Sequence, residues 1–113
     1  MKTSELTGAA LDWAVCKAKG QYQCPVDEYT KVWMASRRYS TDWAQGGPII
    51  EREGINLSHN TFHYTRWEAW TPAPEQEQGE AVALGPTPLI AAMRCYVANK
   101  MGAEVEIPAE LVS

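Results

Sequence analysis

The sequence predicts an α+β fold: a small antiparallel sheet of three to four strands, with an N-terminal and a C-terminal helix packed on one face. Two helical segments with clear ends, one before residue 20 and one after residue 87, flank a central region rich in aromatic side chains. Nine of the eleven aromatic residues lie between Tyr22 and Trp70, which favours strands there. A length of 113 residues predicts a single domain that spans 1–113.

The first helix begins after Thr7, which is the expected N-cap, and ends at Gly20. Leu6 and Leu11 occupy the two positions of a hydrophobic staple around this cap. A narrow stripe of mostly small residues recurs at helical spacing, and it consists of Leu11, Ala14, Val15 and Ala18. We expect this stripe to lie close against the sheet.

The central region predicts two strands with a structured loop between them. Residues 29–34 and 62–70 alternate in side-chain character, as strands do. Between them, residues 39–54 are dense in turn formers, and Gly46-Gly47-Pro48 predicts a turn with a positive φ at one glycine. We expect only one short helical turn, from Pro48 to Glu51, ended by Gly54.

The C-terminal part begins with a flexible loop rich in proline, glutamate and glutamine at 71–80. A short strand is expected at 81–84, and a second helix at 88–101, with Thr87 as N-cap and Gly102 as its stop. Its broad apolar face contains Leu89, Ile90, Met93, Tyr96, Val97 and Met101. The alternating segment 104–108 predicts a final edge strand.

Charge and targeting features narrow the functional classes. Residues 71–113 carry six glutamates against two basic residues, which accounts for the whole net charge of −4. A broad basic surface for binding phosphates is therefore not expected, and nucleic acid is an unfavoured partner. The segment after Met1 lacks the apolar run of an export signal or a membrane span, which predicts a cytoplasmic protein that binds no membrane. Cys16, Cys24 and Cys95 match neither a disulfide framework nor a metal motif.

Metal and catalytic sites are weakly indicated. His59 and His63 are spaced like zinc ligands on a helix, but their sequence context favours a turn or a strand, where four residues span about 13 Å. Four carboxylates are candidates for an acid–base pair or a magnesium site, namely Asp42, Glu51, Glu53 and Glu68. Helix or turn caps and surface ion pairs explain these carboxylates better, and no nucleophile arrangement accompanies them. We therefore predict no catalytic residue, no metal site and no cofactor, with Cys16 and Cys95 as buried, inert thiols.

The aromatic region, with its arginines, is the best candidate for a contact surface. Aromatic side chains that a two-helix layer cannot cover favour a protein partner or a homodimer, and the alternative is that most of these rings form the core. The candidate contact residues are Trp33, Arg37, Arg38, Tyr39, Asp42, Trp43, Arg52, Arg66, Trp67 and Trp70.

Three segments carry a family resemblance: TSELTGAALDWAV at 3–15, YSTDWAQGGPIIEREGI at 39–55 and GPTPLIAAMRCYV at 85–97. Together they resemble the NinX-like family, which consists of small proteins of lambdoid phages and prophages of enteric bacteria. The resemblance implies a phage accessory role among genes between replication and late regulation. It carries over no catalytic residue.

We therefore predict a phage or prophage accessory protein that acts without catalysis, by binding a host or phage protein or a second copy of itself. The first alternative is a nucleic-acid or recombination accessory protein. The predicted order of helices and strands in this chain also fits a double-stranded-RNA-binding domain. However, the start of the second predicted helix at 85–88 lacks the lysines that such a domain uses. The second alternative is a small hydrolase or metal enzyme.

Overall fold

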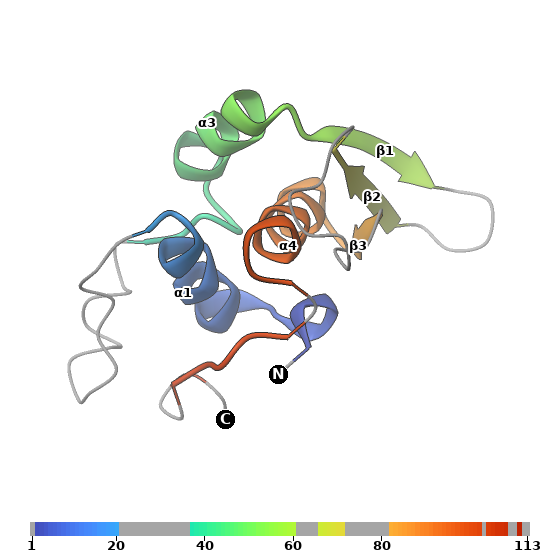
Figure 1. Cartoon of the computed structure of the whole chain (residues 1–113). Coiled ribbons are helices and arrows are strands. Elements are labelled where there is room, and N and C mark those ends of the chain that lie inside the picture. The colour runs from blue at the N-terminus through green and yellow to red at the C-terminus, as the bar shows by residue number, and fades with distance from the viewer. Residues whose placement is uncertain are drawn as a thin grey trace.

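The computed structural model describes residues 2–20, 37–60, 66–71, 82–102, 104–108 and 111. The described secondary-structure elements are, in chain order, a 3-10 helix, two α-helices, three strands and a final α-helix (Figure 1). They are the 3-10 helix η1 (Thr3–Glu5), α1 (Gly8–Ala18), α3 (Trp43–Glu53), β1 (Asn56–Asn60), β2 (Arg66–Trp70), β3 (Ala83–Gly85) and α4 (Pro88–Met101). The predicted α+β class, with a small antiparallel sheet and helices in the N- and C-terminal regions, is confirmed.

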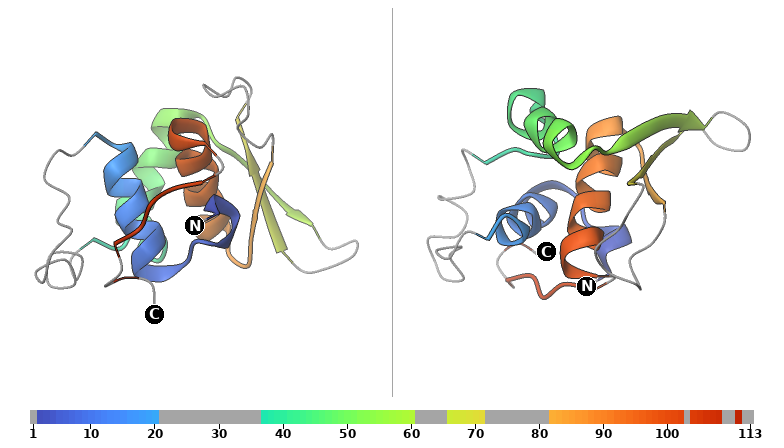
Figure 2. Two further views of the ribbon diagram at one scale, coloured as in Figure 1. Left: turned by 60° about the horizontal axis from the view of Figure 1, so that its bottom comes forward. Right: turned by 45° about the horizontal axis from the view of Figure 1, so that its top comes forward.

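Helix α4 is the centre of the fold. It packs against all three strands on one side and against α1, α3 and η1 on its other sides (Figure 2). Met93 and Val97 have no exposed surface, and small residues such as Ala91 and Ala92 allow neighbouring elements to approach the helix backbone closely. The predicted bounds 88–101 are confirmed, because Thr87 Oγ1 accepts a hydrogen bond from the Ile90 amide at 3.1 Å and Gly102 follows the last turn.

The sheet has the strand order β1-β2-β3, and both pairs are antiparallel. Leu57 lies opposite Ala69, which in turn lies opposite Ala83, so these three side chains share one face of the sheet. Ala69 is fully buried and Ala83 nearly so, because this is the face that α4 covers. Gly85 at the end of β3 permits the closest approach: a Cβ placed there would lie 2.7 Å from the backbone nitrogen of Ala91.

Helix α1 begins at the predicted N-cap, Thr7, although the Thr7 side chain makes no capping hydrogen bond. Leu6 and Leu11 on either side of this cap are both fully buried, as their staple positions predict. The stripe that contains Ala14 and Val15 contacts α4, whereas we expected it to lie against the sheet. Among the described elements, α4 is the helix that packs on the sheet, and α1 stacks on the opposite side of α4 (Figure 1).

The prediction of a loop at 39–54 is wrong for most of its length, because residues 43–53 form the helix α3. Gly46 and Gly47 have no positive φ, so the expected glycine turn is absent. Gly46 is required for packing instead, since a Cβ there would collide with the Tyr39 carbonyl oxygen and would lie 2.7 Å from Leu89 Cδ1. Tertiary contact between α3 and the start of α4 thus overrides the weak helix propensity of glycine and proline.

The end of α3 agrees with the prediction. Gly54 has φ 64° and ψ 39°, the left-handed conformation that favours glycine. The Ile55 amide donates to the Ile50 carbonyl at 3.1 Å, and the Gly54 amide donates to Glu51 at 3.4 Å. These two bonds form a Schellman motif, which stops the helix and leads the chain into β1.

The strands differ in part from the prediction. β1 was not expected, because its sequence NLSHN is polar, and it exists by pairing with β2. The strand expected at 62–70 is observed as β2 at its C-terminal half, and residues 61–65 lie outside the described residues. The strand expected at 81–84 is observed one or two residues later, as β3. The strand expected at 29–34 and loop residues 72–80 also lie outside the described residues.

The expected edge strand at 104–108 is wrong. Glu104 makes one isolated antiparallel bridge with Lys2, and the segment follows α1 and not the sheet (Figure 2). Val105 is 5% exposed and belongs to the core, so its burial against the helices fixes the path of this segment. Thr3 Oγ1 donates to the Gly102 carbonyl at 2.8 Å, which joins η1 to the residue after α4.

Arg94 on α4 connects three parts of the fold. Its Nε donates to the Leu6 carbonyl at 2.9 Å and its Nη1 donates to the Leu84 carbonyl at 2.7 Å. One guanidinium therefore satisfies backbone oxygens before α1 and in β3.

Candidate functional site

Trp43 is the most exposed large apolar side chain among the described residues, with 53% of its surface accessible. It is the first residue of α3, and its ring lies beside Gly47 one turn later. A Cβ at Gly47 would lie 3.9 Å from Trp43 Cε3. The solvent-facing side of the helix is called the α3 outer face below, and it consists of the exposed Trp43, Ala44, Pro48, Glu51 and Arg52 with the partly exposed Gly47 among them. Glu51 and Arg52 have long charged side chains, whereas the other neighbours of Trp43 on this face have short ones.

Asp42 positions the start of α3. Its Oδ1 accepts a hydrogen bond from the Ala44 amide at 2.9 Å, and its Oδ2 accepts one from Gln45 Nε2 at 3.2 Å. Gln45 Oε1 in turn accepts a hydrogen bond from the Arg38 amide at 3.0 Å. The carboxylate of Asp42 thus serves as a helix cap, the structural alternative to a catalytic role.

The turn before α3 is anchored to α1 by Asp12, a residue that the sequence analysis did not single out. Asp12 is 5% exposed, and its Oδ1 accepts a hydrogen bond from the Ser40 amide at 2.8 Å. Burial raises the pKa of the Asp12 carboxyl, and hydrogen bonds from Ser40 oppose this rise. Tyr39 beside it is 7% exposed and belongs to the core, and burial together with Cys16 raises the pKa of Tyr39 to about 12.

Asp12 should make the stability of the fold depend on pH. Because its folded-state pKa lies above the unfolded value, its contribution is full below the unfolded pKa and is lost as pH rises through the folded pKa. Asp12→Asn keeps the acceptor for the Ser40 amide and cannot ionise. We expect the free energy of unfolding of this variant, relative to the wild type, to increase as the pH rises above the ordinary pKa of an aspartate, as measured in urea titrations. A difference that does not change with pH would contradict the burial of this carboxyl.

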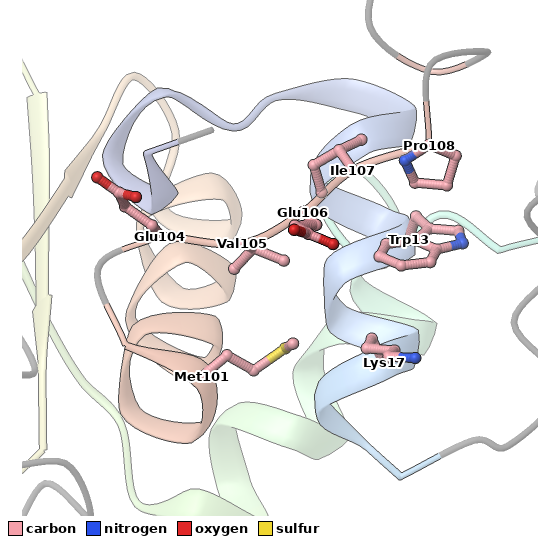
Figure 3. Close-up of a pocket in the computed structure, with 8 residues that line it drawn as sticks. All are labelled: Trp13, Lys17, Met101, Glu104, Val105, Glu106, Ile107 and Pro108. Atoms are coloured by element: carbon pink, nitrogen blue, oxygen red, sulfur yellow. The ribbon is translucent and has the colours of Figure 1, made fainter.

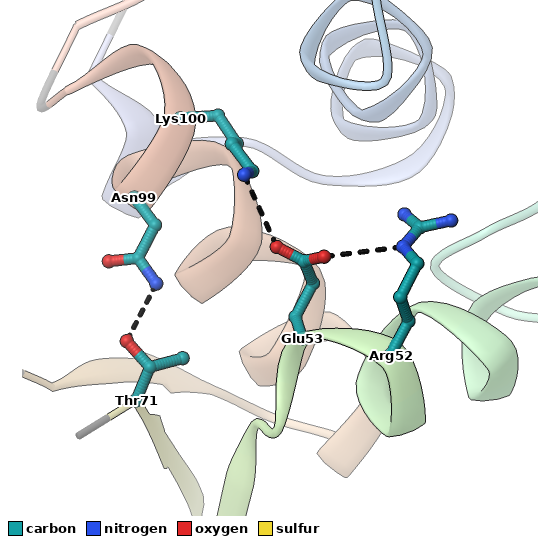
Figure 4. A network of polar contacts seen from close by, with 5 residues as sticks. All are labelled: Arg52, Glu53, Thr71, Asn99 and Lys100. Atoms are coloured by element: carbon teal, nitrogen blue, oxygen red, sulfur yellow. Dashed lines mark hydrogen bonds and ion pairs between the residues drawn. The ribbon is translucent and has the colours of Figure 1, made fainter. Parts of the chain in front are cut away.

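Arg52 takes part in a polar network between α3 and α4 (Figure 4). Its Nε lies 3.2 Å from Glu53 Oε2, and Lys100 Nζ lies 3.3 Å from Glu53 Oε1. Next to this group, Asn99 Nδ2 donates to Thr71 Oγ1 at 2.8 Å and joins α4 to the residue after β2. Glu53 therefore ties the C-terminal ends of the two helices together, and Arg52 is an ion-paired residue at the edge of the molecule.

Three candidate contact residues lie on β2, away from α3. Trp67 points to the same face as Ala69, packs against the core and stacks on the His59 ring at a centroid distance of 4.7 Å. By strand alternation, Arg66 and Trp70 lie on the opposite face of the sheet and are partly buried. The predicted contact residues therefore do not form one surface. Arg37 and Arg38 precede α3, Asp42 caps it and Trp43 is its first residue. Tyr39 is in the core, and Trp33 lies outside the described residues.

The histidines, cysteines and carboxylates of the described residues do not form a metal site. Within them, no group of three or more histidine, cysteine or carboxylate side chains is placed to hold a metal ion. His59 belongs to β1, a strand that the sequence did not predict, and His63 lies outside the described residues. Cys16 and Cys95 are buried free thiols, and burial raises the pKa of Cys95 to about 11. A neutral thiol at physiological pH is a poor nucleophile.

A groove of about 480 Å³ lies between α1 and the 104–108 segment (Figure 3). Its apolar lining consists of Trp13, Met101, Val105, Ile107 and Pro108. Lys17, Glu104 and Glu106 supply its charged groups. None of these residues belongs to the predicted contact surface. The alternating pattern of 104–108 predicts a strand of the sheet, which would keep this segment away from α1.

The family model described as bacteriophage P22, NinX matches residues 2–100. The chain belongs to this family. The resemblance expected from the three sequence segments is therefore confirmed, and membership of the NinX family makes the chain a phage accessory protein. No curated protein matches it.

The NinX match covers α1, α3, the sheet and almost all of α4. The α3 outer face thus lies within the part that defines the family, whereas the 104–108 wall of the groove lies beyond the matched residues. None of the helices in the described part of this NinX-family chain is long and apolar enough to cross a membrane.

Proposed function

We propose that this NinX-family chain is a non-catalytic protein-interaction module, which binds a host or phage protein through the α3 outer face. The observation that carries the proposal is the exposure of Trp43, because 53% of the surface of this large apolar residue is accessible. Tryptophan is enriched among the residues that dominate interface energies, because it buries a large area at a small cost in side-chain entropy.

The neighbours of Trp43 support the same reading. Ala44, Gly47 and Pro48 have no long side chain that a partner must immobilise or displace. A partner surface can therefore approach the helix backbone while the indole inserts into a pocket of the partner. Asp42 caps the helix and Asp12 anchors the preceding turn, which holds Trp43 in place before binding.

The proposed location is the cytoplasm of the infected bacterium. Two buried cysteines are free thiols in the described structure, which fits a reducing compartment. A cytoplasmic location would give the α3 outer face access to both phage and host proteins.

Affinity purification from phage-infected cells tests the proposal, with Trp43→Ala compared against Val82→Ala. Val82 is the matched control, because it is the other exposed large apolar side chain among the described residues, at 41%. We expect the wild type and Val82→Ala to recover the same partner, and Trp43→Ala to lose it. Both variants should unfold within about 0.5 kcal/mol of the wild type, since surface substitutions change stability little. Retention of the partner by a folded Trp43→Ala variant would contradict the proposal.

Binding to nucleic acid is tested separately by titrating salt against random duplex and single-stranded DNA. The acidic C-terminal third opposes phosphate binding, so we expect no micromolar binding at physiological salt. Arg37 and Arg38 precede α3 and are the basic residues nearest in sequence to Trp43. Micromolar DNA binding that falls steeply with salt and is lost on replacing both arginines would favour the nucleic-acid accessory role instead.

A further inference from the structure

The groove between α1 and the 104–108 segment has the dimensions of a small-molecule site. Its volume of about 480 Å³ lies within the usual range of ligand pockets, about 300 to 1,000 Å³. Trp13 and Val105 are buried and form its floor, and Met101, Ile107 and Pro108 are half-buried and form its walls. Such a lining favours an apolar ligand body, because the contact removes apolar surface of both partners from water.

The charged groups of the groove determine which ligand charge it favours. In Figure 3, the Glu106 carboxylate extends from the 104–108 segment towards α1, where Trp13 lies. Within the described residues, the Glu106 carboxylate makes neither a hydrogen bond nor an ion pair, whereas the Lys17 ammonium lies 5.8 Å from the centroid of the Trp13 ring. Together with Glu104, the groove has two carboxylates and one ammonium, a net charge that attracts cations.

We propose that this groove binds a small organic cation with an apolar ring body. The ring would occupy the space between Met101, Ile107 and Trp13, and its ammonium or guanidinium group would pair with Glu106. The site lies on the side of α1 away from α3, so the proposal does not depend on the α3 outer face (Figures 1 and 3).

Two probes with the same bicyclic ring and opposite charges test the proposal: tryptamine, which is a cation, and indole-3-propionate, which is an anion. Each is titrated into the isotopically labelled full chain and followed by the amide shifts of residues 105–107 and the indole shift of Trp13. We expect tryptamine to bind at these residues and to bind more tightly than indole-3-propionate. Equal affinities, no tryptamine binding, or shifts confined to another surface would overturn the proposal.

Glu106→Gln and Lys17→Gln provide a matched pair of variants, because both side chains are exposed and line the same groove. Glu106→Gln should weaken tryptamine binding about two- to fivefold, which is the usual effect of one exposed charge pair, and Lys17→Gln should strengthen it. Thermal unfolding midpoints close to that of the wild type would show that both variants are folded. If the two substitutions change the affinity in the same direction, or not at all, the charge assignment is wrong.

Discussion

Met93→Ala should lower the free energy of unfolding by about 2 to 5 kcal/mol, the range for removing a large side chain from a packed core. Met93 has no exposed surface and lies on α4, the helix that contacts every other described element. The surrounding elements cannot all collapse into the space left behind, so the loss includes a cavity contribution in addition to the transfer of the side chain.

Met101→Ala is the matched control for this prediction. Met101 belongs to the same helix but is only half-buried, beside the groove. Urea titration of both variants should therefore give a clearly smaller loss for Met101→Ala. Equal losses would show that α4 is not the centre of the core.

Gly85→Ala should destabilise the protein by about 1 to 3 kcal/mol or more, although it adds only one methyl group. The added Cβ would lie 2.7 Å from the Ala91 nitrogen and 3.0 Å from its Cα. Both are backbone atoms, which cannot move away without shifting β3 from α4. Separation of these elements would also strain the bond from Arg94 to the Leu84 carbonyl.

Gly47→Ala provides the opposite control. Gly47 is helical, and the nearest atom to a Cβ there is Trp43 Cε3 at 3.9 Å, an ordinary van der Waals distance. Alanine at this position should stabilise α3 by about 0.5 to 1 kcal/mol, because it reduces the entropy of the unfolded chain. If thermal unfolding ranks Gly85→Ala as the more stable of the two variants, the close packing of β3 on α4 is wrong.

Helix α4 was predictable because its ends are encoded locally. Thr87 supplies the cap to Ile90 and Pro88 fits the first turn, and neither depends on residues distant in sequence. Its central position was not predictable from periodicity, because alanines cover the side opposite the expected apolar face. Small residues do not mark a face as buried until a neighbouring element is known to approach it.

Helix α3 and strand β1 show where local sequence is insufficient. Gly46-Gly47-Pro48 favours a turn by propensity, but the close contact of Gly46 with Tyr39 and Leu89 stabilises a helix. The polar segment of β1 becomes a strand because β2 provides hydrogen-bond partners. In both cases, the deciding interactions come from residues elsewhere in the chain.

The candidate site was predictable only as a set of residue types. The sequence places Tyr39 and Trp43 in one aromatic region, yet one is 7% and the other 53% exposed. Between them, the Ser40 amide donates to Asp12, a contact between residues 28 positions apart that the local sequence does not reveal. The groove was missed because the path of the 104–108 segment is determined by the burial of Val105 against the helices.

Site-specific photo-crosslinking in infected cells tests most directly whether the α3 outer face contacts a protein partner. A benzophenone amino acid is incorporated at position 43 in one variant and at position 82 in the other, because both positions are exposed. The proposed function predicts one dominant adduct from position 43 that is not formed from position 82. Absence of an adduct at position 43, or the same adducts from both positions, would contradict the assignment of this face as the interaction surface.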